Sequence, residues 1–125
     1  MSVQHYRELI VWQKAIGLVE TVYRATENFP KTEIYALTNQ IRRAAVSIPS
    51  NIAEGQGRNS TRDFLHFLPV AQGSLLELET QIIIAERLGY FDKAQENSLL
   101  ETTAEISRML SGLRNSLNKK LTTNH

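Results

Sequence analysis

The sequence predicts an all-α protein, folded as an antiparallel up-down four-helix bundle. Three observations lead to this prediction. Apolar residues recur at spacings of three and four in four long segments, short stretches with proline or glycine separate the segments, and no segment alternates apolar and polar residues as a strand would. The length of 125 residues suits one domain of the commonest size, so we expect a single domain over residues 1–125.

Helix breakers and capping residues set the expected helix boundaries. The first helix stops before Pro30, because the residue preceding a proline disfavours helical backbone. The second ends at the Gly55–Gly57 stretch, and Gly89 is a good residue to follow the end of the third. Ser60 and Asp92, each followed three residues later by an acid or a glutamine, are typical N-caps. The predicted helices cover residues 6–28, 32–56, 60–88 and 92–121.

The first and third segments carry more apolar residues than one bundle core needs. Either the core is wide, or the extra apolar faces form subunit interfaces, since monomers rarely leave large apolar patches in water. In the first segment, the main stripe and the second stripe are Leu9, Trp12, Ile16, Val19 and Tyr23, and Val11, Ala15, Leu18, Val22, Ala25 and Phe29. In the third segment, the extra residues are Phe67, Val70, Leu76, Ile83 and Ile84.

Two prolines lie inside the helical pattern of the second and third segments. Pro49 and Pro69 each remove one backbone donor, yet the apolar periodicity continues past both. We therefore expect kinks at these positions rather than helix ends. Side chains of Ser47, Ser50 or Asn51 are placed to satisfy backbone groups that Pro49 leaves without a partner.

Composition argues against several classes of chemistry. The chain has no cysteine, which excludes disulfides and thiolate sites. Asp63 and His66 form one carboxylate-x-x-His unit, whereas a di-iron bundle needs two such units. No secretory signal or membrane-spanning run is visible, so a cytoplasmic location is expected. We expect no catalytic residue, no cofactor and no metal site, and therefore a protein that is not an enzyme.

Charge is segregated along the chain although the net charge is only +1. Residues 31–62 sum to +3, residues 77–105 to −5, and the tail 106–125 to +4. Such segregation steers an anionic partner or matches one subunit to another.

The densest polar group lies in the second segment, and two interpretations of it stay open. On a helix Arg43, Ser47, Ser50 and Glu54 fall near one face. One interpretation is a structural polar network that satisfies the kinked helix and fixes subunit register, formed by Ser47, Ser50, Asn51 and Glu54. The other is a groove that recognises a partner or nucleic acid, because arginine and asparagine suit phosphates and base edges; its residues are Arg42, Arg43, Asn51, Arg58 and Arg62.

Four stretches of the chain resemble the bacterial four-helix-bundle proteins of the 23S rRNA intervening-sequence family. The resemblance extends from about Tyr6 to Leu117. The stretches that carry it are Leu9–Ala15, Phe29–Pro30, Gln40–Gly55 and Gly73–Glu79.

The resemblance implies an up-down four-helix bundle, a ring-like homopentamer and no known enzymatic activity. Some members are encoded inside intervening sequences of ribosomal RNA genes, and the family is similar to the accessory protein of diversity-generating retroelements, a basic pentamer that engages nucleic acid and a reverse transcriptase. Two functions follow as hypotheses. The first is a homo-oligomeric scaffold that binds another protein, and the second is RNA or DNA binding through a basic rim formed by the second helix and the loop after it.

Overall fold

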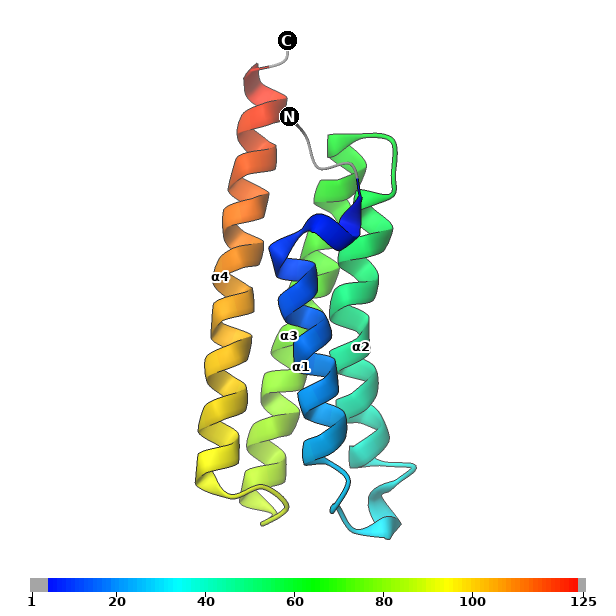
Figure 1. Cartoon of the computed structure of the whole chain (residues 1–125), viewed down its shortest axis with the longest axis vertical. Coiled ribbons are helices and arrows are strands. Elements are labelled where there is room, and N and C mark those ends of the chain that lie inside the picture. Colours follow the sequence, from blue (N-terminus) through cyan, green and yellow to red (C-terminus); the bar gives the residue numbers. More distant parts are fainter. Residues whose placement is uncertain (1–4, 124–125) are drawn as a thin grey trace.

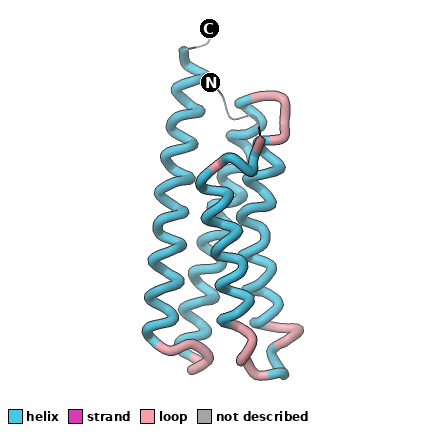
Figure 2. Tube along the Cα trace, viewed as in Figure 1, coloured by secondary structure: helices cyan, strands magenta, loops and turns pink. Residues whose placement is uncertain are grey.

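The computed structural model describes residues 5–123 and contains a bundle of four long helices, as predicted (Figure 1). Within the described residues there is no strand. The loops that join consecutive helices lie at alternate ends of the bundle (Figure 2). The long helices are α1 (Ile10–Ala25), α2 (Leu37–Gln56), α3 (Thr61–Arg87) and α4 (Lys93–Thr123), and two short 3-10 helices, η1 (Tyr6–Glu8) and η2 (Lys31–Glu33), precede α1 and α2.

Local capping signals place the ends of α3 and the start of α4 close to the predicted positions. The Ser60 hydroxyl accepts a hydrogen bond from the Asp63 amide at 3.0 Å. Gly89 has a φ of 82°, a left-handed conformation that glycine adopts without strain and that ends α3. The side chains of Asp92 and Gln95 each accept a hydrogen bond from the other's backbone amide, at 2.7 and 2.9 Å, which makes a reciprocal capping box.

The first two helices start later than the sequence suggests. A turn capped by His5 forms η1, and extended backbone at Leu9 separates it from α1. Glu33 lies in η2, before α2 begins. Its carboxylate accepts a hydrogen bond from the Leu37 amide at 3.3 Å, so it caps the helix from the preceding turn.

The core is apolar and continuous through all four helices. In α1, however, the stripe that faces the core is not the main stripe defined from the sequence. Its second stripe faces the core, with Ala15 and Val22 fully buried. The main stripe is only half-buried, and Tyr23 at its end is 42% exposed. Val11 and Leu18, which we considered as interface residues, are thus covered within the chain itself.

Both internal prolines lie within uninterrupted helix. α2 continues through the buried Pro49, and α3 continues through the exposed Pro69. The kinks at these positions stay a prediction. No helix among the described residues combines the length and the apolar character that crossing a membrane requires.

Candidate interaction surfaces

Arg42 fastens α2 to the end of α1. Its Nε donates to the Thr26 hydroxyl at 2.9 Å, and its Nη2 donates to the Tyr23 carbonyl at 3.3 Å. The guanidinium also lies 4.6 Å from the centre of the Tyr23 ring. Thr26 is in turn bonded to α1, because its hydroxyl donates to the Val22 carbonyl at 2.8 Å. This member of the predicted recognition set therefore satisfies carbonyls at the C-terminus of α1.

The predicted polar network around Pro49 ties α2 to α3. The Ser47 and Ser74 hydroxyls are 2.8 Å apart, and Asn51 Nδ2 donates to the Ser47 hydroxyl at 3.0 Å and to its carbonyl at 2.8 Å. The Ser50 hydroxyl donates to the Val46 carbonyl at 2.8 Å. The carbonyls that accept these bonds belong to Val46 and Ser47, the two residues after Ala45. The Ala45 carbonyl is the one that loses its helical partner, because Pro49 has no backbone N–H. Asn51, the second member of the recognition set, is thus occupied within the bundle.

Arg43 and Glu54 lie on the outward face of α2 and are exposed. Neither makes an ion pair or a side-chain hydrogen bond with another residue in the part of the chain that the structure describes. They do not pair with each other. Glu54 consequently lies outside the hydrogen-bonded network that Ser47, Ser50 and Asn51 form.

Arg58 and Arg62 lie at the opposite end of α2 from Arg42. The Arg58 guanidinium is 5.0 Å from the centre of the Phe67 ring, and Arg62 is exposed in the first turn of α3. Gly55 lies near the end of α2, three residues before Arg58. It is already about 20 Å from Arg42 along the helix axis at 1.5 Å per residue. The predicted recognition residues therefore do not come together as one groove.

An exposed apolar face lies along α3. Four of the five extra apolar residues noted in the third segment lie on it: Val70 at 50% exposure, Leu76 at 54%, Ile83 at 39% and Ile84 at 42%. Phe67 is the exception, because it packs against Gly55, where an added Cβ would come within 2.7 Å of the Phe67 Cβ. Monomeric proteins rarely expose a continuous apolar face of this kind.

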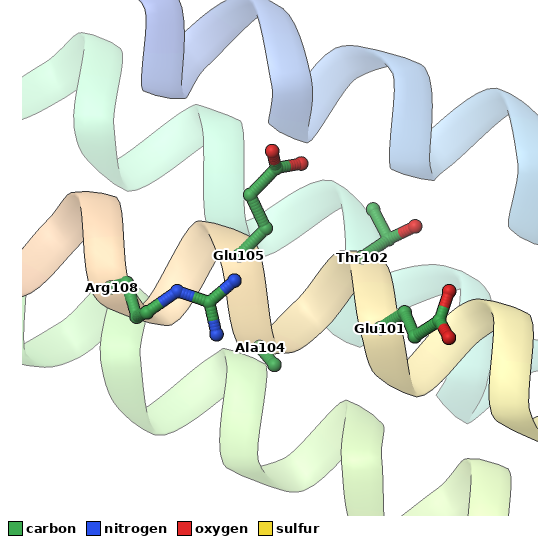
Figure 3. A pocket seen from close by; sticks show the side chains of 5 residues that line it. All are labelled: Glu101, Thr102, Ala104, Glu105 and Arg108. Atoms are coloured by element: carbon green, nitrogen blue, oxygen red, sulfur yellow. The ribbon is translucent and has the colours of Figure 1, made fainter.

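Two shallow hollows lie on the part of the surface that the structure describes. One, of about 430 Å³, lies on the outward face of α4 and is lined by Glu101, Thr102, Ala104, Glu105 and Arg108 (Figure 3). Figure 3 shows the carboxyl groups of Glu101 and Glu105 pointing in different directions. Glu105 is paired with Lys14 of α1 at 3.2 Å.

A second hollow of about 360 Å³ runs between α1 and α4 past Gly17. Among the described residues no cluster of three or more histidine or acidic side chains is arranged to hold a metal ion. Neither hollow offers a paired nucleophile and base.

The end of the bundle that carries the α1–α2 and α3–α4 loops is fastened by aromatic and charged contacts. Phe29 contacts Phe91 and Tyr90, with ring centres 4.9 and 5.3 Å away. The Tyr90 hydroxyl donates to Glu33 at 2.8 Å, and this hydrogen bond raises the pKa of Tyr90 above its ordinary 10.0. Lys93 pairs with Glu96 at 3.1 Å, and the hydrogen bond raises the pKa of Lys93. We call this region the latched end.

Comparison with known proteins agrees with this geometry. The family model described as "23S rRNA-intervening sequence protein" matches residues 7–112. The chain belongs to this family. A solved structure from Bacteroides thetaiotaomicron VPI-5482, described as a protein with unknown function from the S23 ribosomal protein family, has a TM-score of 0.75 and 24% sequence identity. The match covers 84% of this chain and 98% of that one, and it supports the fold.

No curated protein matches the chain. The intervening-sequence family and its structural neighbour are not described as enzymes, and the neighbour is described as having unknown function. The family description names no molecular activity, so the function has to be inferred from the surfaces of the bundle.

Proposed function

We propose that this intervening-sequence protein is a non-enzymatic scaffold that assembles from copies of itself through the outward face of α3. The family resemblance implies a homopentamer. The single observation that carries the proposal is the composition of that face, which is exposed, apolar and almost free of charge.

The outward face of α3 is almost free of charge. Glu77 is the one charged residue among the exposed positions of α3 between residues 67 and 86. The exposed positions of α4 between residues 93 and 111 are instead mostly polar or charged. The exposed positions of α3 are Pro69, Val70, Gly73, Leu76, Glu77, Thr80, Ile83 and Ile84.

Gly73 adds an argument that is independent of hydrophobicity. Glycine in the middle of a helix costs about 1 kcal/mol relative to alanine. A Cβ added at Gly73 would meet no atom of the chain within 4 Å, so packing inside the subunit does not require a glycine there. The close approach of another subunit to α3 would supply a reason.

The energetics favour a copy of the same chain as the occupant. Fully burying one leucine or isoleucine side chain is worth about 1.5–3 kcal/mol, and association costs at least about 4 kcal/mol, so several partly exposed side chains must be covered together. Val70, Leu76, Ile83 and Ile84 are such a set. A net charge of +1 leaves little repulsion between copies. The unpaired Arg43 and Glu54 on α2 offer opposite charges for neighbouring subunits to align.

The test is sedimentation velocity of the wild-type protein beside a Leu76→Glu/Ile83→Glu variant. We expect the wild type to sediment as one species of five times the 14.2 kDa chain mass, and the variant to sediment as a monomer. The charge-matched control, Asn97→Glu/Ser98→Glu, adds the same two charges to exposed positions of α4 and should stay assembled. Circular dichroism checks that each variant is helical.

Two results would overturn the proposal. One is a monomeric wild type at micromolar concentrations. The other is equal assembly of the α3 variant and the α4 control, which would place the interface elsewhere.

A further inference from the structure

The end of the bundle opposite the latched end brings together basic residues that are far apart in sequence. The Gln72 amide donates to the Ser107 hydroxyl at 2.9 Å, and this contact sets the register of the neighbouring helices α3 and α4. Arg62 lies ten residues before Gln72, and Leu117 lies ten residues after Ser107, so Arg62 is level with the last turns of α4. Figure 1 shows the α2–α3 loop, η1 and the C-terminal turns of α4 at this same end.

This basic end has a clear excess of positive charge. Its six basic residues are Arg7, Arg58, Arg62, Arg114, Lys119 and Lys120, and all of them are exposed. Its acidic residues are Glu8, Glu54 and Asp63, which leaves a net charge of +3. The last turns of α4 rise beyond the α2–α3 loop and carry no acid at all (Figure 1).

The basic residues of the two ends differ in whether they form ion pairs. At the latched end, Lys93 is paired with Glu86 at 3.5 Å and with Glu96 at 3.1 Å. At the basic end, Arg62 and Arg114 make no ion pair with any residue that the structure describes. Arg58 is held over the Phe67 ring, a contact that leaves the guanidinium edge available for hydrogen bonds. Arg58, Arg62 and Arg114 are thus not neutralised by an ion pair with any described residue.

We propose that the basic end binds the phosphate backbone of a nucleic acid. Four of its six basic residues are arginines, whose planar guanidinium groups match phosphate oxygens in pairs. The groups are spread over a loop, a 3-10 helix and the ends of two long helices rather than gathered around one hollow. An extended polyanion contacts several of them at once, whereas a single small anion does not. The residues differ from the rim expected from the sequence, because Arg42 and Asn51 are occupied within the bundle and the tail of α4 joins Arg58 and Arg62.

Useful affinity rests on the proposed assembly. A net charge of +3 on one subunit supports only weak binding at physiological salt, and a cyclic assembly repeats the basic end in every copy at the same side of the ring. Binding of this kind weakens steeply with salt, because each neutralised phosphate releases counterions.

The experiment is a fluorescence-anisotropy titration of the full chain with a labelled RNA hairpin, a labelled DNA duplex and labelled polyglutamate, at low and at physiological salt. The test variant is Arg58→Gln/Arg62→Gln/Arg114→Gln. The charge-matched control is Arg24→Gln/Lys31→Gln/Arg87→Gln, which removes three exposed positive charges at or near the latched end. We expect the test variant to weaken binding of RNA or DNA at least about tenfold and to flatten its salt dependence, with the control within about threefold of wild type.

Three results would overturn the inference: no binding of RNA or DNA at low salt, equal weakening by test and control variants, or preference for polyglutamate. Binding to RNA alone or to DNA alone identifies which phosphate backbone is the ligand. Light scattering on the same samples separates this inference from the proposed function. An assembled protein that does not bind contradicts the basic end only, and a monomer that binds through Arg58, Arg62 and Arg114 contradicts the assembly only.

Discussion

The latched end and the basic end of the bundle use polar side chains in opposite ways. At the latched end, Tyr90 bonds to Glu33, Lys93 pairs with two glutamates, and aromatic rings pack beneath them. At the basic end, Arg62 and Arg114 extend into solvent without an ion pair to any described residue. The difference teaches that one end of the fold is closed by its own side chains, whereas at the other end Arg62 and Arg114 are not neutralised by an ion pair with a described residue.

The largest expected effect comes from removing the aromatic packing of the latched end. Phe91 is 2% exposed, and its ring centre is 4.9 Å from that of Phe29. Phe91→Ala should lower the free energy of unfolding by about 3–5 kcal/mol, because it leaves a cavity. Arg62→Ala at the basic end should change it by less than about 0.5 kcal/mol. Urea unfolding of both variants gives the comparison, and equal losses would break the contrast between the ends.

A smaller effect is expected where α2 and α3 approach each other below the basic end. A Cβ at Gly55 would lie 2.7 Å from the Phe67 Cβ and 3.0 Å from the Phe64 ring. Gly55→Ala should cost about 1–2 kcal/mol, because the overpacking outweighs the gain in helix propensity. Gly112→Ala in α4 is the matched control, since nothing lies within 4 Å of an added Cβ there, and it should stabilise the protein. Thermal unfolding measures both, and a stabilised Gly55→Ala would contradict the close contact.

The smallest expected effect is the pH dependence of the stability that the latched end contributes. The hydrogen bond to Glu33 raises the pKa of Tyr90 above 10.0, so the folded state holds this proton more tightly than the unfolded chain. The contribution to stability is therefore complete below pH 10 and is lost as the pH rises through the raised pKa of Tyr90. Unfolding midpoints followed across this range should fall less steeply for Tyr90→Phe than for wild type. Tyr35→Phe is the control, and it should keep the wild-type slope.

Features fixed by neighbours in sequence were predictable, and features fixed by neighbours in space were not. The caps at Ser60, Gly89 and Asp92 depend on residues within one turn, and they were predicted correctly. Glu33 caps α2 from outside the helix while bonding Tyr90, a residue 57 positions later. No local pattern contains that contact, so the start of α2 was placed too early.

The same distinction explains the surfaces. Both stripes on α1 were visible in the sequence, but the choice of the stripe with Ala15 and Val22 for the core depends on where α2 and α4 pack. The apolar surplus of α3 was also visible in the sequence, and four of its five residues stay exposed in the part of the chain that the structure describes. Arg42 was predicted to bind a partner, but in the structure it binds the Thr26 hydroxyl and the Tyr23 carbonyl. These groups lie at the end of a different helix, so no local sequence pattern reveals the contact.

The burial of the α3 face in solution is the central claim, and cysteine accessibility tests it most directly. The chain contains no cysteine, so Ile83→Cys on α3 and Ala94→Cys on the exposed start of α4 each carry one reactive thiol. At micromolar concentrations of native protein, we expect a maleimide to modify the thiol at position 83 much more slowly than the thiol at position 94, and at the same rate after unfolding. Equal rates in the native protein would show an uncovered α3 face and would contradict the account.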